Sequence, residues 1–307
     1  MRKRLIYRCD DVGYTATYDA GIFNVIDAGI GCSADVMFDA ENCVEALMKL
    51  KERPWVSIGW HRHLWEKPVL DPQEVPSMVD ENGRFKWGHR NNQFKKEVTY
   101  EDAYKEFKAE MALCYKVLGR YPDVASMGTF DARIPLEAAF YDVCKEYGIV
   151  TNYFQACVFR ERKLGESEED YQEMLKNAKT PIDEQWKEKN IISCPIAVGG
   201  SYDLKNFSEY QPIIPMTNLV WSDKEEIYFY GWHPGFLDDH IFKESSLSIH
   251  RVKEYVDALS FDYQNWLIEN HIELINFRDA LYGTNELQDH LKAINSPLYI
   301  GNMEGNK

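Results

Sequence analysis

The sequence has few cysteines, and none of them stands at the spacing of a metal knuckle or a redox motif. Seven cysteines are scattered over 307 residues, and no two form a C-x-x-C pair. Such a pair is typical of zinc ribbons and of thiol–disulfide oxidoreductases, so its absence argues against both classes. An odd and scattered set of cysteines indicates reduced thiols in a cytosolic core, which predicts a cytoplasmic protein.

The sequence also lacks a long apolar run. A membrane-spanning helix needs roughly 20 consecutive apolar residues, and no stretch approaches that length. The basic start, Met1–Arg4, resembles the beginning of an export signal. The apolar segment that should follow is cut short by Arg8, Asp10 and Asp11. We therefore expect neither a membrane span nor an export signal.

Basic residues are outnumbered. The chain has 35 lysines and arginines against 50 aspartates and glutamates, which gives a net charge of −15. The resulting field repels nucleic-acid phosphates and anionic membrane surfaces, so neither is expected as a partner. A neutral or cationic small molecule is easier to accommodate. A homo-oligomer is compatible with the sequence, which does not decide the oligomeric state.

Short apolar or β-branched runs alternate with helical patterns along the chain. The clearest helix is Asp102–Leu118, whose apolar residues share one face and which is followed by Gly119. Strands are expected at 5–9, 34–38, 56–60, 124–130, 149–154, 227–232 and 273–277, and further helices at 18–28, 43–50, 136–147 and 252–270. This alternation predicts an α/β protein with a parallel sheet and outer helices. We expect one domain over residues 1–300, a (β/α) barrel that is distorted or seven-stranded.

Two long segments interrupt the alternation. Residues 67–98 contain three prolines and an Asn-Gly turn, and residues 159–211 combine a charged run with a Gly-Gly pair. Both are too long for plain connectors, so we expect lids or insertions that shape a substrate cleft. Residues 301–307 are expected to form a flexible tail.

Two adjacent carboxylates, Asp10 and Asp11, end the first predicted strand. Neighbouring residues on a strand point in different directions, so one carboxylate can bind a hard cation while the other accepts a proton from bound water. An Asx turn or a helix N-cap is the alternative interpretation.

Two histidines, His61 and His63, follow the third predicted strand. Residues i and i+2 of an extended segment share a face, so both rings can ligate one ion. A partnered core histidine explains either residue equally well.

Three further polar residues also follow predicted strands. Asp131 and Arg133 can orient catalytic groups through charge-assisted hydrogen bonds, although a structural ion pair is the simpler interpretation. His233 stands between a strand end and a Pro-Gly turn, a position suited to a general acid or to a histidine that merely packs. Because the carboxyl ends of barrel strands meet at one mouth, we expect all these motifs to converge there.

Taken together, the motifs resemble those of the YdjC-like, or chitooligosaccharide deacetylase, family of the polysaccharide deacetylase superfamily. The resemblance covers most of the chain and is weakest over 151–226. The matching segments are Asp10–Tyr14 (Asp-Asp-Phe-Gly-Tyr in the family), Gly59–Val69 (Gly-x-His-x-x-Leu and Lys-Pro-Val), Val75–Phe85 (Val-Pro-Ser-x-Val-Asp), His233–Gly235 (His-Pro-Gly) and Ile272–Asp279 (Ile-Glu-Leu-Ile-Asn-x-Arg-Asp).

The resemblance implies a hydrolase that removes an acetyl group from an N-acetylated amino sugar or oligosaccharide, using one divalent metal ion such as zinc or magnesium. It implies that Asp11 and His61 are metal ligands, that Asp10 is the general base and that His233 is the acid. Exposed tryptophans near the motifs are candidate stacking platforms for sugar rings, namely Trp60, Trp65, Trp87 and Trp232.

The chain departs from the family at one ligand motif. The family's Asp-Ser-His-x-His is replaced by Asp131-Ala132-Arg133-Ile134-Pro135, which keeps the aspartate and loses both histidines. We interpret His63 as a replacement ligand. The departure leaves two alternatives open: a carbohydrate-binding protein that has lost the metal site, or a metal-dependent amidohydrolase that acts on a non-sugar amide.

Overall fold

The computed structural model describes residues 2–86, 97–127, 134–153, 167–169, 186, 188–193, 210–219, 221 and 225–304. The strands are β1 (Lys3–Val12), β2 (Ser33–Val36), β3 (Ser57–Trp60), β4 (Val124–Met127), β5 (Val150–Tyr153), β6 (Ile191–Ser193), β7 (Ile227–Trp232) and β8 (Ile272–Leu274). The helices are α1 (Ala16–Asp27), α2 (Cys43–Lys51), η1 (Pro72–Glu74), α4 (Tyr100–Leu118), α5 (Pro135–Tyr147), α8 (Ile213–Thr217), α9 (Asp239–Glu244), α10 (His250–Ala258), α11 (Phe261–Glu269), α12 (Phe277–Tyr282), α13 (Glu286–Ala293) and α14 (Ile300–Glu304).

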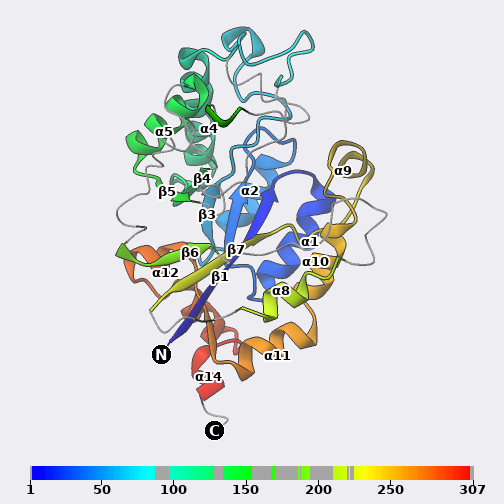
Figure 1. The fold of residues 1–307 in the computed structure, drawn as a ribbon, viewed down its shortest axis with the longest axis vertical. Helices are drawn as coiled ribbons and strands as arrows, with labels where there is room; N and C mark the ends of the chain where they lie inside the picture. Colours follow the sequence, from blue (N-terminus) through cyan, green and yellow to red (C-terminus); the bar gives the residue numbers. More distant parts are fainter. Residues whose placement is uncertain are drawn as a thin grey trace.

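The eight strands form one parallel sheet with helices outside it (Figure 1). Seven strands follow the order β5-β4-β3-β2-β1-β7-β6, and β8 pairs with the first residues of β1. Within the described residues β5 and β6 do not pair, so the sheet curls into a half-barrel that is left open between them. The predicted distorted (β/α) barrel is confirmed.

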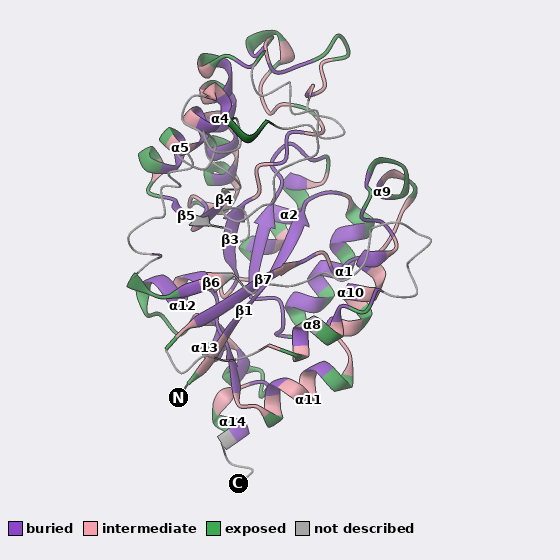
Figure 2. Ribbon diagram, viewed as in Figure 1, coloured by how far each residue is buried: buried purple, intermediate pink, exposed green. Residues whose placement is uncertain are grey.

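The central strand β1 is buried almost from end to end. Leu5–Val12 have no exposed residue, as is usual for a strand covered on both faces by a parallel sheet's helices. Figure 2 shows that β2, β3 and most of β7 are also buried, while the helices around the sheet have both buried and exposed residues. No helix in the described part of the chain is long and apolar enough to span a membrane.

Local signals explain where the helices begin and end. Thr15 and Thr99 cap α1 and α4 by accepting hydrogen bonds from backbone N–H groups of the first turn. Helix α4 ends at Gly119, whose φ of 76° is the left-handed conformation that glycine adopts without strain.

Three elements differ from the expectations. The single helix expected at 252–270 is wrong, because α10 and α11 are separated at Ser260, which is extended and caps α11. The short strand β6 lies inside the segment expected to be an insertion, most of which is outside the described residues. Within the expected tail, residues 301–304 belong to α14 and Met303 is buried, while 305–307 lie outside the described residues.

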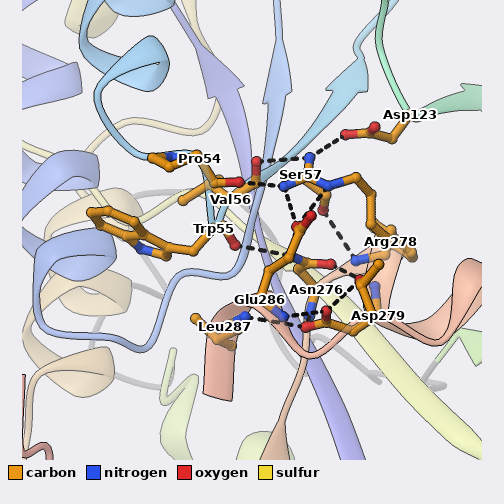
Figure 3. A network of polar contacts seen from close by, with 12 residues as sticks. Pro54, Trp55, Val56, Ser57, Asp123, Asn276, Arg278, Asp279, Glu286 and Leu287 are labelled. Carbon is orange, nitrogen blue, oxygen red and sulfur yellow. Dashed lines mark hydrogen bonds and ion pairs between the residues drawn. The ribbon is translucent and has the colours of Figure 1, made fainter. Parts of the chain in front are cut away.

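The last matching motif, Ile272–Asp279, belongs to a hydrogen-bond network at the amino ends of the strands, which we call the floor of the barrel. Arg278 donates hydrogen bonds to the Val56 carbonyl oxygen (3.2 Å), to Asp123 Oδ2 (2.9 Å) and to Glu286 Oε2 (2.7 Å) (Figure 3). Asn276 and Asp279 form a capping box at the start of α12. Because Val56 and Asp123 precede β3 and β4, this network ties the C-terminal helices to the end of the sheet opposite the candidate site.

Candidate active site

Four of the residues singled out in the sequence meet at the carboxyl ends of three strands. Asp10 and Asp11 lie near the end of β1, His61 follows β3, and His233 follows β7. His61 Nε2 is 3.0 Å from Asp11 Oδ1, and His233 Nε2 is 4.0 Å from Asp10 Oδ2. Both imidazole side chains are 24% exposed, so they are open to a substrate, whereas the two carboxylates are buried.

A bulge in β1 aims the two carboxylates in different directions. Cys9 pairs with Ala34 of β2 and Val12 with Val36, so β1 has one extra residue over this interval. Asp11 takes a positive φ of 60°, a conformation that aspartate tolerates better than most residues. Bulges of this kind commonly re-aim side chains next to active sites.

Asp10 is held by a buried arginine. Arg8, two residues earlier on the same face of β1, donates from Nε to Asp10 Oδ1 (2.6 Å) and from Nη2 to Oδ2 (2.9 Å). Burial opposes the charge on Arg8, but Asp10 and Asp35 outweigh it and raise the pKa of the guanidinium. The bidentate geometry fixes the orientation of the Asp10 carboxylate.

His61 lies between two carboxylates. Its Nε2 faces Asp11, and its Nδ1 is 3.7 Å from Oδ2 of the fully buried Asp35 on β2. The same Asp35 oxygen accepts a hydrogen bond from Ser126 Oγ (2.6 Å) and lies 3.4 Å from Arg8 Nη1. Burial works against protonation of His61, but its bonds to Asp11 and Asp35 raise the pKa of the imidazole to about 10.

Helix α10 contributes two buried side chains to the site, one turn apart. Arg251 Nη2 donates to Asp11 Oδ2 (2.7 Å). Glu254 accepts a hydrogen bond from the backbone N–H of His233, and its Oε2 is 3.6 Å from His233 Nδ1. Burial opposes the charge on Asp11, but Arg251 and the hydrogen bond from His61 hold the pKa of that carboxyl well below its usual range.

The sequence interpretation missed four of these residues: Arg8, Asp35, Arg251 and Glu254. Two signals were available. Arg8 and Asp10 alternate on one face of an otherwise apolar strand, and a buried charge there needs a partner. Arg251 and Glu254 are three positions apart, so they share a face of α10.

His63 has surroundings different from those expected of a metal ligand. Its ring is buried, its Nδ1 is 3.6 Å from Asp39 Oδ2, and its centroid lies 3.7 Å from that of Trp65 and 6.1 Å from that of His61. Nowhere in the described ranges do three or more His, Cys, Asp or Glu side chains form a group that could hold a metal. The structure therefore brings Asp11 and His61 together without His63.

Two donors are in place for a divalent cation. Asp11 Oδ1 and His61 Nε2 are the oxygen and nitrogen ligands that zinc and related ions accept, and they face each other across 3.0 Å. Asp11 and His61 therefore fit as two ligands of a cation that binds at least one further ligand. Asp131 and Arg133, the altered part of the family motif, lie outside the described residues.

The proposed sugar-stacking tryptophans separate into two groups. Trp60 and Trp232 are fully buried in the core, so neither can stack on a sugar, and this expectation was wrong for both. Trp65 is half-buried beside His63 and lines a pocket. Trp87 lies outside the described residues.

Comparisons with known proteins identify the family of the chain and support its fold. The family model described as YdjC-like protein matches residues 4–269. A carbohydrate deacetylase of Enterococcus faecalis is 24% identical over 90% of this chain and 97% of its own, and one of Clostridium beijerinckii is 25% identical over 90% and 99%. A crystal structure from Enterococcus faecalis, described as a proposed cellobiose-phosphate cleavage protein, shares the fold with a TM-score of 0.62, at 23% identity over 91% of this chain and 99% of that one. The chain belongs to the YdjC-like family.

Proposed function

We propose that the protein is a carbohydrate deacetylase that removes the acetyl group from an N-acetylated amino sugar or oligosaccharide. One observation carries the proposal: the Asp10 carboxylate and the His233 imidazole lie 4.0 Å apart, beside the paired Asp11 and His61. This arrangement supplies a base, an acid and a cation site for amide hydrolysis. The names of the relatives support the same reaction.

The reaction needs two proton movements, and the site has a group for each. Asp10, oriented by Arg8, takes a proton from the attacking water as the oxygen bonds to the amide carbon. When the tetrahedral intermediate collapses, the C–N bond breaks and His233 donates a proton to the departing amine. The products are acetate and the free amino sugar. Glu254 accepts a hydrogen bond from the backbone N–H of His233, which keeps the acid close to Asp10.

A divalent cation, zinc or magnesium, is part of the proposal, with Asp11 and His61 as its ligands. When bound, the cation supplies Lewis acidity to the carbonyl oxygen and lowers the pKa of a bound water. Arg251 holds the second oxygen of Asp11 and leaves Oδ1 directed at His61. We also propose a cytoplasmic location, since the cysteines at 9, 32, 43, 114 and 144 are free and buried.

The proposal is tested by measuring acetate and free amine released from N-acetylglucosamine and its β-1,4-linked oligomers. Protein loaded with zinc or magnesium should release the two products in equal amounts, and treatment with a chelator should abolish release until the cation is restored. Release of no acetate from any N-acetylated sugar by the metal-loaded protein would overturn the function. Undiminished release by metal-free protein would overturn the role of the cation.

A further inference from the structure

The carboxylate of Glu254 has a second partner besides His233. Its Oε2 accepts the hydrogen bond from the His233 backbone and faces the His233 ring, while its Oε1 accepts a hydrogen bond from the hydroxyl of Tyr210. Tyr210 and Glu254 are both buried. A buried carboxylate needs donors from the protein itself, because it has given up its contact with bulk water. The two oxygens of Glu254 are therefore divided between Tyr210 and His233.

Tyr210 is held by the same helix that carries Glu254. Its ring meets the ring of buried His250 edge to face, with centroids 4.8 Å apart and planes at 83°. Its carbonyl oxygen accepts a hydrogen bond from Lys253 Nζ (2.7 Å). Lys253 and Glu254 lie three and four positions after His250, so both neighbour it on the surface of α10. The helix thus fixes the backbone and the ring of Tyr210 and directs its hydroxyl at Glu254.

The helix that follows Tyr210 is attached to α10 as well. Helix α8 lies beside α10 (Figure 1), and the N–H of Ile213, its first residue, donates to Asp257 Oδ2 (3.0 Å) on α10. The position of Tyr210 is therefore set by two successive parts of the chain that dock on one helix. From there the contacts run through Glu254 to His233, whose ring faces Asp10 in the candidate active site.

The chemistry of a tyrosine suits this position. Asp10 and Asp11 are each bonded by an arginine, whose positive charge opposes that of the carboxylate. The hydroxyl of Tyr210 is neutral, so it satisfies Oε1 of Glu254 without opposing the charge of this carboxylate. The negative charge then remains available to the His233 imidazolium, which has to hold its proton until the amine departs. Tyr210 therefore orients Glu254 and leaves its charge to the acid.

We propose that Tyr210 is a positioning residue for the catalytic acid: its hydroxyl fixes the Glu254 carboxylate, which in turn fixes the backbone and the ring of His233. Loss of the hydroxyl lets the carboxylate rotate and loosens His233, without removing any group that touches the substrate. The inference rests on the proposed function for the role of His233 as the acid. The placement of His233 by Tyr210 and Glu254 is a property of the folded protein, so it can be measured without substrate or cation.

The first test measures hydrogen exchange of backbone amides by NMR, on the full-length protein in the presence of a chelator. In Tyr210→Phe the N–H of His233 should exchange about fivefold faster than in the wild-type protein, the effect of weakening one hydrogen bond. The N–H of Asp279, which donates to Asn276 Oδ1 (2.7 Å) at the opposite end of the sheet, should exchange at an unchanged rate. Equal exchange at His233 in the two proteins, or faster exchange at both amides alike, would overturn the proposal.

A matched control removes the hydroxyl of another buried tyrosine. Tyr228, near the amino end of β7, donates from its hydroxyl to Glu226 Oε2 (2.6 Å). Tyr228→Phe therefore also removes a hydrogen bond between a tyrosine and a carboxylate, but away from Glu254. The exchange rate at His233 should be the same in Tyr228→Phe as in the wild-type protein, and an increase equal to that in Tyr210→Phe would contradict a specific role of Tyr210.

The second test compares the steady-state kinetics of acetate release. Tyr210→Phe keeps its ring against His250, so its Tm should fall by only a few degrees, while kcat should fall about tenfold with KM nearly unchanged. Adding Tyr210→Phe to Glu254→Gln should lower kcat no further, because the hydroxyl acts through the carboxylate.

The outcomes of the two tests are distinct. A double variant much slower than Glu254→Gln, or a kcat of Tyr210→Phe equal to that of the wild-type protein, would overturn the proposal. Faster exchange at His233 of Tyr210→Phe, in a protein that releases no acetate, would keep the positioning contact and refute the deacetylase.

Discussion

Two buried arginines set the electrostatics of the candidate site. Arg8 pairs with Asp10, and Arg251 pairs with Asp11, so each of the adjacent carboxylates has its own cationic partner. Removing one member of a buried pair leaves an uncompensated charge, at a cost of about 3–5 kcal/mol. Substitutions at the carboxylates should therefore be isosteric if an effect on chemistry is to be distinguished from unfolding.

In the proposed reaction, Glu254 acts through His233 as a positioning residue. Glu254→Gln keeps the shape of the side chain, but it weakens the hydrogen bond from the His233 backbone and the contact with the His233 ring. We expect kcat to fall by about 10–100-fold, the usual effect of losing a supporting partner, with KM nearly unchanged. A structural role alone would instead lower Tm and leave kcat of the folded protein intact. Steady-state kinetics and thermal unfolding of the same preparation decide between the two.

His63 has two interpretations with opposite outcomes. A third metal ligand at this position would make His63→Asn lose the cation. The contacts of His63 with Asp39 and Trp65 favour the other result, in which the metal content of the variant stays the same. Metal analysis of the purified variant, with His61→Asn as the control that should lose the ion, distinguishes the interpretations. Loss of the ion from both variants would restore His63 as a ligand.

Asp19 makes the stability of the protein depend on pH. Its carboxylate accepts hydrogen bonds from Gly13 N–H and Asn42 Nδ2, yet burial raises the pKa of Asp19 to about 7. This lies above the unfolded value of about 3.9, so the folded state binds the proton more tightly. The stabilisation is complete below about pH 4 and is lost as the pH rises to 7.

Asp19→Asn removes this titration. Urea unfolding of the wild-type protein and the variant should show a difference in unfolding free energy that changes between pH 5 and pH 8, moving in favour of the variant at the higher pH. A difference that stays constant over this range would show that Asp19 does not titrate there.

At the scale of elements, the sequence predicts the positions of helices and strands best where the local conformational preference and burial in the fold favour the same structure. Strand β7 lies at the predicted residues, because its apolar run is buried, and α4 ends at the predicted glycine. Strand β6 has three residues, too few to show a period. The break at Ser260 was missed because apolar residues continue on both sides of it, and the serine acts as a cap only in an extended conformation.

The candidate site could be predicted in part for a related reason. Asp10, Asp11, His61 and His233 end strands, where the barrel gathers its polar side chains, and their motifs are compact in sequence. Arg251 and Asp11 are 240 positions apart, so their contact depends on tertiary folding alone. The surroundings of His63 depend equally on the fold, because the i, i+2 rule requires an extended chain, and Leu64 with its φ of 62° shows that the chain turns directly after this residue.

At the scale of the whole molecule, the two ends of the barrel have different roles. The carboxyl ends of the strands hold the candidate active site, and the floor holds the network around Arg278 (Figure 3). Variants at the floor should change the stability of the protein without changing its chemistry, because residues at this end of β/α barrels generally serve stability.

Arg278→Met tests this separation. It removes one charged donor from each of the Asp123 and Glu286 carboxylates and from the Val56 and Pro54 carbonyl groups. Because the Arg278 side chain is only 13% exposed, the unfolding free energy should fall by about 3 kcal/mol. The matched control is Arg53→Met, whose partner Asp27 is 49% exposed, and which should cost less than about 1 kcal/mol. Urea unfolding gives both values, and a loss in Arg278→Met no larger than in the control would contradict the account. The kcat of Arg278→Met, measured under conditions in which the variant is folded, should equal that of the wild-type protein.

The most direct test of the deacetylase uses a sugar dimer labelled with ¹³C in its acetyl groups and follows the label by NMR. Metal-loaded wild-type protein should convert the amide signal into free acetate, and Asp10→Asn, with the same metal content and a folded spectrum, should do so about 10²–10⁴-fold more slowly. Label that remains in the amide with wild-type protein, or equal rates for the two proteins, would contradict the central claim.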